Sequence, residues 1–135
     1  MIALIAAAWA GAYEVLRARD EPGCAALGEV AREELAGLAE EDVQPPWVPV
    51  RAARCLVELY PDAETAARVR PWMADPSRAG LALVVVGKLD LLPLAEATEL
   101  ARAALATPDE RQRARVQRRL AASERAELRA VVATP

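Results

Sequence analysis

The chain has 135 residues, enough for one domain with a buried core. Alanine makes up nearly a quarter of it and phenylalanine is absent, a composition that suits closely packed helices because alanine is the best helix former. The net charge of −3 gives no general attraction to nucleic acid or anionic lipid. The charge is uneven, however. Residues 1–108 carry ten basic and sixteen acidic side chains, whereas residues 109–135 carry seven arginines and four acids.

Few residue types that support catalysis are present. Histidine, the commonest general base and metal ligand, is absent. Ser77 and Ser123 have no evident partner base, and no glycine-rich phosphate loop occurs. Cys24 and Cys55 are too few and too isolated for a disulfide scaffold or a zinc site, so we interpret both as small apolar residues. We therefore expect no enzymatic activity, no cofactor and no metal.

The first segment, residues 1–18, is apolar and is predicted to form a buried helix. Ala-Trp-Ala at 8–10 resembles a signal-peptide cleavage site, but the run is short and has no positive region before it. Glu14 and Arg17 end the run before it could span a bilayer. We expect a cytoplasmic protein without a membrane span.

The next segments alternate between helical patterns and turns rich in proline. A turn around Pro22-Gly23 precedes a helix over 24–41, and Pro45-Pro46 separates it from a helix over 47–60. Pro61 ends that helix. Asp62 is a candidate N-cap for a helix over 62–74, which Pro71 should kink or shorten.

Four more helices are predicted in the second half, over 78–91, 94–106, 109–122 and 124–133. The run Leu-Ala-Leu-Val-Val-Val at 81–86 could also be a buried strand, but its place in the repeat described next favours a helix. Ser123 is expected to cap the last helix, with Glu127 completing its first turn.

Two stretches of the chain repeat each other at a spacing of 32 residues. Residues 61–76 align without a gap on residues 93–108, and residues 128–135 repeat the second half of the unit. A period near thirty residues indicates a repeat array. The identical pairs are Pro61/Pro93, Ala63/Ala95, Glu64/Glu96, Arg70/Arg102, Ala74/Ala106 and Pro76/Pro108.

The junctions between these units carry a family resemblance. Ala-Asp-Pro-Ser-Arg at 74–78 resembles the turn between HEAT-like repeats of the bacterial phycobilisome-lyase type, and Val-Arg-Ala-Ala-Arg at 50–54 is similar to the start of a HEAT first helix. Thr107-Pro108 fits that turn less well. Tetratricopeptide repeats have a similar period, but their aromatic and Gly-Tyr positions are not matched. The resemblance implies an interaction role without naming the partner.

We predict an all-α fold, a single domain built as a right-handed α-solenoid of about four antiparallel hairpins, at 1–41, 47–74, 78–106 and 109–133. The favoured function is a non-enzymatic scaffold or adaptor that binds another protein. Two alternatives remain open. One is a nucleic-acid-binding module that uses the C-terminal arginines, and the other is a non-catalytic subunit of an enzyme complex.

Arg70, Arg102 and Arg129 are the first candidate partner-binding residues, because they hold the same register in three successive second helices. In HEAT-like arrays the second helices line the concave surface. A row of guanidinium groups there would suit an acidic partner segment. The alternative is that these arginines pair with nearby glutamates, such as Glu99 or Glu127.

Leu81 and Val84 are the second candidate site. When the first helices are aligned on a shared leucine, these two apolar residues occupy positions that are polar in both flanking hairpins. If that stripe faces outward, they form an apolar island suited to self-association or docking. If the central helix is buried all round, they belong to the core.

Overall fold

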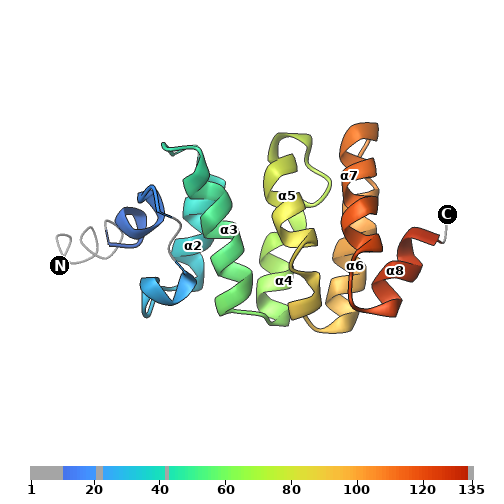
Figure 1. Ribbon diagram of the computed structural model, residues 1–135, viewed down its shortest axis with the longest axis horizontal. Coiled ribbons are helices and arrows are strands. Elements are labelled where there is room, and N and C mark those ends of the chain that lie inside the picture. Colours follow the sequence, from blue (N-terminus) through green and yellow to red (C-terminus); the bar gives the residue numbers. More distant parts are fainter. Residues whose placement is uncertain (1–10, 21–22, 42, 134–135) are drawn as a thin grey trace. The chain divides into compact units, whose positions relative to one another are not determined.

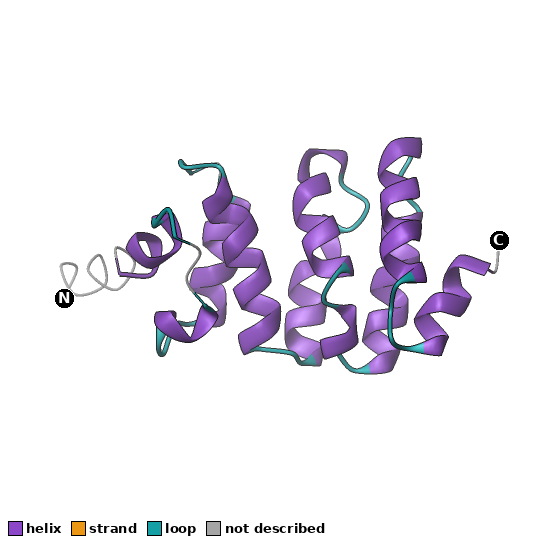
Figure 2. Ribbon diagram, in the orientation of Figure 1, coloured by secondary structure: helices purple, strands orange, loops and turns teal. Residues whose placement is uncertain are grey.

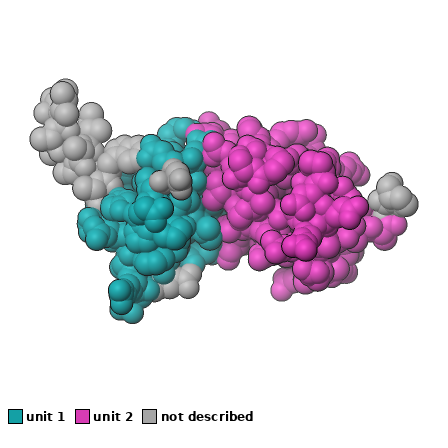
Figure 3. All heavy atoms as spheres, turned by 90° about the horizontal axis from the view of Figure 1, so that it is seen from above, with its two compact units in different colours: residues 1–60 teal, residues 61–135 magenta. Residues whose placement is uncertain are grey.

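The computed structural model describes residues 11–20, 23–41 and 43–133, and every regular element in these ranges is a helix (Figures 1 and 2). This confirms the all-α prediction. Contacts divide the chain into two compact units, residues 1–60 and residues 61–135 (Figure 3). We call them unit 1 and unit 2. The boundary lies between the two helices of the predicted hairpin 47–74.

Unit 1 contains fewer continuous helices than its sequence predicts. Its elements are a helical segment over 11–17, a 3₁₀ helix η1 (Cys24–Leu27), α2 (Arg32–Glu40) and α3 (Trp47–Leu59). The helix predicted over 24–41 is broken, because Gly28 adopts a φ of 66°, a left-handed conformation that glycine tolerates. The predicted segment 1–18 lies partly outside the described residues.

Unit 2 follows the predicted helices closely, with short 3₁₀ turns between them. Its α-helices are α4 (Ala63–Val69), α5 (Ala79–Val86), α6 (Leu94–Leu105), α7 (Glu110–Ala121) and α8 (Ala126–Ala133). Pro71 shortens α4 as predicted, since the chain continues past Val69 as the 3₁₀ helix η2 (Arg70–Trp72). The predicted helix 78–91 is divided into η3 (Pro76–Arg78), α5 and η4 (Leu89–Leu91).

The helices of unit 2 pack in two layers. Helix α6 contacts both α4 and α8, and α5 contacts α7, while α6 also packs against α5 and α7. Figure 1 shows α5 and α7 side by side in one layer and α4 and α6 in the other. Each helix therefore contacts the next helix in the sequence or the next but one, as expected when hairpins stack.

The links between elements repeat at a nearly constant sequence separation. Hydrogen bonds, one ion pair and a disulfide join residues that are 29 to 36 positions apart, close to the repeat period found in the sequence. In unit 1 they join Tyr13 to Gln44, Cys24 to Cys55, Tyr60 to Val30 and Arg51 to Leu16. In unit 2 they join Arg70 to Glu99, Gln112 to Ala79, Ser123 to Asp90 and Arg125 to Leu92.

Asp62 caps α4 as the sequence predicts. Its side chain accepts a hydrogen bond from the backbone N–H of Thr65 at 2.9 Å. We expect Asp62→Ala to lower the free energy of unfolding by about 1 kcal/mol, because one N–H at the helix start loses its acceptor. Urea unfolding followed by circular dichroism measures this loss. Asp62→Asn is the control, since asparagine also caps helices; equal losses in the two variants would contradict the capping role.

Candidate functional site

A groove in the described part of unit 2 lies between α6 and α8. It has a volume of about 610 Å³. Alanine and leucine side chains form much of its wall, and two charged groups and one hydroxyl supply its polar atoms. Its lining residues are Thr98, Arg102, Leu105, Ala106, Glu127, Ala130 and Val131.

Arg102 is the predicted site residue that lies in this groove. Its side chain is exposed, and its guanidinium makes no hydrogen bond or ion pair to any other described residue. Glu127 lines the same groove from α8 but lies beyond salt-bridge distance of Arg102. The groove thus offers an available cation beside apolar walls, a combination that suits a partner group carrying a carboxylate.

The other two predicted arginines have partners within unit 2. Arg70 donates to the Glu99 carboxylate at 3.0 Å, which is the glutamate pairing considered as the alternative. Arg129 donates to the backbone carbonyl of Ser123 at 2.7 Å. Among the three, only Arg102 retains all of its hydrogen-bonding capacity. The structure therefore does not present three equivalent free cations.

The structure does not expose Leu81 and Val84 together as an apolar island, and the burial of Leu81 agrees with the alternative that this helix belongs to the core. Leu81 is only 7 % exposed and Val84 is half-buried. The reason is that α5 packs against both α6 and α7. The side of α5 that carries Leu81 therefore faces other helices and not solvent. In α7, Gln112 at the position equivalent to Leu81 is also buried, and it donates to the Ala79 carbonyl at 2.9 Å.

A second contact shows how closely α7 approaches α5. The Arg119 guanidinium donates to the Leu83 carbonyl at 3.3 Å, near the C-terminal end of α5. A Cβ on Gly87 would lie 2.9 Å from Arg119 Nη1, so glycine leaves the space that this side chain occupies. The cation also interacts favourably with the negative end of the helix dipole.

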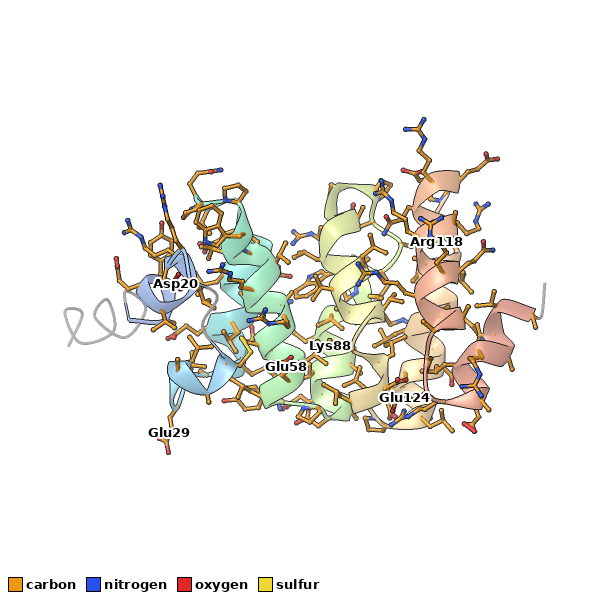
Figure 4. The ribbon with its side chains drawn as sticks, in the orientation of Figure 1. Asp20, Glu29, Glu58, Lys88, Arg118 and Glu124 are labelled. Atoms are coloured by element: carbon orange, nitrogen blue, oxygen red, sulfur yellow. A yellow bond between two sulfur atoms is a disulfide. The ribbon has the colours of Figure 1, made fainter. Side chains whose placement is uncertain are left out.

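The outer face of α7 carries a row of arginines. Arg111, Arg115 and Arg118 are separated by four and three positions, so they share one face of the helix, and all three are exposed. None of their guanidinium groups is hydrogen bonded or ion-paired to a described residue. Figure 4 labels Arg118 on this helix. This face is a basic surface on a chain whose net charge is negative.

The interpretation of both cysteines as unpaired apolar residues is wrong. Cys24 and Cys55 form a disulfide with a Cα–Cα distance of 5.3 Å, and the Glu58 carboxylate lies 2.8 Å from Cys24 Sγ. Figure 4 draws the disulfide in yellow and labels Glu58 on α3. The sequence held one signal for this pairing. The cysteines are 31 residues apart, close to the 32-residue repeat period, and other contacts of unit 1 join residues at a similar separation.

Asp90 links η4 to the start of α8. Its carboxylate accepts hydrogen bonds from the Ser123 hydroxyl and, at 3.1 Å, from the Glu124 backbone N–H. Ser123 Oγ in turn accepts from the Arg125 N–H at 3.1 Å, but α8 begins at Ala126, two residues later than predicted, so Ser123 lies before the helix and is not its N-cap. The Ser123 hydrogen bond is the main cause that holds the pKa of Asp90 below its ordinary value of 3.8. Burial opposes this effect, and the Glu124 N–H and the charges of Arg125 and Arg129 add to it.

We expect Asp90→Asn to destabilise the protein at neutral pH, because asparagine cannot supply the ionised acceptor for these hydrogen bonds. The loss should be on the order of 1 kcal/mol, since solvent screens the charge of this partly exposed carboxylate. A lowered folded-state pKa means that this contribution is complete above pH 3.8 and is lost as the pH falls through the folded value. Urea midpoints of both proteins, measured from neutral pH to below 3.8, should converge at the acid end. A constant difference would exclude the carboxylate charge as its cause.

Comparison with protein-family models, with curated proteins and with solved structures found no match for this chain. The HEAT-like resemblance therefore rests on the repeat spacing and the turn motifs in the sequence. None of the described helices is both long enough and apolar enough to cross a membrane.

Proposed function

We propose that this protein is a non-enzymatic scaffold or adaptor of HEAT-repeat type, and that it binds a segment of another protein in the groove between α6 and α8. A right-handed α-solenoid of about four hairpins is the architecture that goes with this proposal. The two-layer packing of unit 2 and the links at 29 to 36 residues within each unit support it.

The observation that carries the binding proposal is the state of Arg102. A guanidinium without a partner in the described residues lines a groove whose remaining walls are largely apolar. A partner carboxylate would form a charge-assisted hydrogen bond with it, while apolar partner side chains cover Leu105 and Val131. Glu127 disfavours a second acidic group at the α8 side of the groove, so the partner segment should be only locally acidic.

Arg102→Gln and Arg70→Gln form a matched pair for testing this site. Both variants remove one arginine at the same repeat register, but the Arg70 guanidinium is already bonded to Glu99. Once the bound protein has been identified by co-purification from the source cell, we expect Arg102→Gln to weaken its affinity by about 10-fold or more, as for the loss of a hydrogen bond to a charged group.

Arg70→Gln should leave that affinity within about twofold, because Arg70 contributes to an exposed ion pair of small energy. Calorimetric titration with the identified partner gives both values. Equal affinities for the wild type and Arg102→Gln would refute the groove as the binding site. Equal losses of affinity in Arg102→Gln and Arg70→Gln would indicate a general effect of charge and not a specific contact in the groove.

The basic face of α7 supports a second function, nucleic-acid binding through Arg111, Arg115 and Arg118. Phosphate contacts made by arginine release counterions, so binding would weaken steeply as salt rises. Titration of labelled DNA and RNA at several salt concentrations tests this function. The triple substitution of these arginines by glutamine should then abolish binding. Absence of binding at low salt would exclude the nucleic-acid-binding function and leave protein binding as the supported one.

A third function, a non-catalytic subunit of an enzyme complex, is tested by the same co-purification, because the bound protein would then be an enzyme.

The sequence predicts a cytoplasmic protein, yet disulfides persist mainly in oxidising compartments, so the Cys24–Cys55 bond favours such a location. Alkylation of thiols in intact cells before lysis decides this point, since a reduced pair would be labelled there and a disulfide would not.

A further inference from the structure

The surroundings of the disulfide form a cluster of three potential metal ligands. Cys55 and Glu58 are three positions apart on α3, so both side chains lie on the same face of that helix. Cys24, the first residue of η1, meets them from a distant part of the sequence. The two sulfur atoms and a Glu58 carboxylate oxygen all lie within 4.8 Å of one another.

The Glu58 carboxylate lies against the sulfur of Cys24. Its Oε2 lies 2.8 Å from Cys24 Sγ, which is hydrogen-bonding distance for a thiol that donates to a carboxylate. A sulfur in a disulfide has no hydrogen to donate. In the reduced pair the same contact becomes a thiol–carboxylate hydrogen bond, or it brings two ligands to one cation.

We propose that the reduced form of this cluster is a Zn²⁺ site, with Cys24 and Cys55 as thiolate ligands and Glu58 as the carboxylate ligand. Two sulfurs and one oxygen leave a fourth tetrahedral position for water. Thiolates select zinc over the hard cations magnesium and calcium. The same two sulfurs cannot bond to each other and to the metal, so the oxidation state of the pair decides whether the site exists.

A small-molecule dithiol transfers two electrons and two protons to the Cys24–Cys55 bond, which becomes two thiols while the dithiol becomes a disulfide. Binding of Zn²⁺ then displaces the two thiol protons to solvent and forms two Zn–S bonds. Oxidation by a small-molecule disulfide reverses the sequence and releases the metal.

The local structure is compatible with both states. Zn–S bonds of about 2.3 Å place two ligand sulfurs roughly 3.8 Å apart in a tetrahedral site. Side-chain rotation accommodates this separation, because the Cα atoms are 5.3 Å apart and the backbone can stay in place. Cys24 and Cys55 are buried while Glu58 is half-buried, so the carboxylate side provides access for the ion and its water.

Titration of the reduced full-length chain with Co²⁺ under anaerobic conditions tests the proposal, because Co²⁺ reports thiolate ligands and tetrahedral geometry in its absorption spectrum. We expect one equivalent to bind with a thiolate-to-cobalt charge-transfer band, and Zn²⁺ to displace it. The oxidised protein is the matched control and should give no such band. A reduced protein without this band would overturn the proposal.

Glu58→Gln tests the third ligand while both cysteines stay in place. We expect its Co²⁺ affinity to fall by about 10-fold or more, since even supporting groups around a metal contribute that much. Zn²⁺ should also raise the thermal midpoint of the reduced wild type more than that of the variant. Undiminished affinity in Glu58→Gln would show that the carboxylate is not a ligand and would refute the three-ligand site.

Discussion

Reduction of the Cys24–Cys55 disulfide in the presence of a metal chelator is expected to lower the stability of unit 1 by about 3 to 4 kcal/mol. The bond closes a loop of 31 residues, and reopening such a loop restores chain entropy to the unfolded state. The bond also joins η1 to α3. Because Cys24 is the buried residue of η1, the disulfide is the main attachment of this short helix. Urea unfolding of the oxidised and reduced protein measures the difference.

The double variant Cys24→Ala/Cys55→Ala separates this effect from other actions of the reductant. It should unfold near the midpoint of the reduced wild type and be insensitive to reductant. Hydrogen exchange should locate the loss in residues 23–59, since the bond lies within unit 1. Coincident midpoints for the oxidised and reduced wild type would show that the disulfide contributes nothing to stability.

The helices of unit 2 could be predicted from the sequence because their signals are local. Pro61, Pro71 and Pro93 mark boundaries that the chain cannot cross as regular helix, and Asp62 begins α4 through its own side chain. The choice of helix for residues 81–86 depended on the repeat alignment, and α5 confirms it. The break at Gly28 was missed, since a single glycine inside a helical pattern is often tolerated.

The burial of Leu81 could not be predicted in the same way. The sequence shows which positions of three hairpins correspond, but not which way that stripe faces. The contacts of α7 give the answer, because Gln112 and Arg119 both reach α5 with polar tips. A glutamine and an arginine can cover a neighbouring helix as leucine does, so polarity at these positions was a poor guide to exposure.

The candidate binding residues were predictable as a set but not individually. Repeat register places Arg70, Arg102 and Arg129 at equivalent positions, and equivalence suggests a common role. Their surroundings differ because the residues opposite them are not repeated. Arg70 meets Glu99, whereas the groove beside Arg102 provides no acceptor within reach among the described residues. The availability of an arginine is therefore a property of its tertiary neighbours.

Trp72→Ala is expected to lower the free energy of unfolding by about 3 to 5 kcal/mol. Trp72 is the largest fully buried side chain among the described residues, at 1 % exposure, and it follows the proline that ends α4. Replacing an indole by a methyl group removes a large apolar area from the core and leaves a cavity that rigid helices fill only in part. Unfolding in urea, followed by circular dichroism, gives the loss without depending on the tryptophan that is removed.

Two further variants show whether the loss of stability in Trp72→Ala comes from the burial and volume of the side chain. Trp72→Phe keeps most of the aromatic volume, so its loss of stability should be less than half of the loss in Trp72→Ala. Trp47→Ala removes a tryptophan that is 37 % exposed in unit 1, so its effect should be near 1 kcal/mol. If Trp72→Ala costs no more than Trp47→Ala, then Trp72 is not a core residue. If Trp72→Phe is as damaging as alanine, the polar N–H of the indole matters more than its volume.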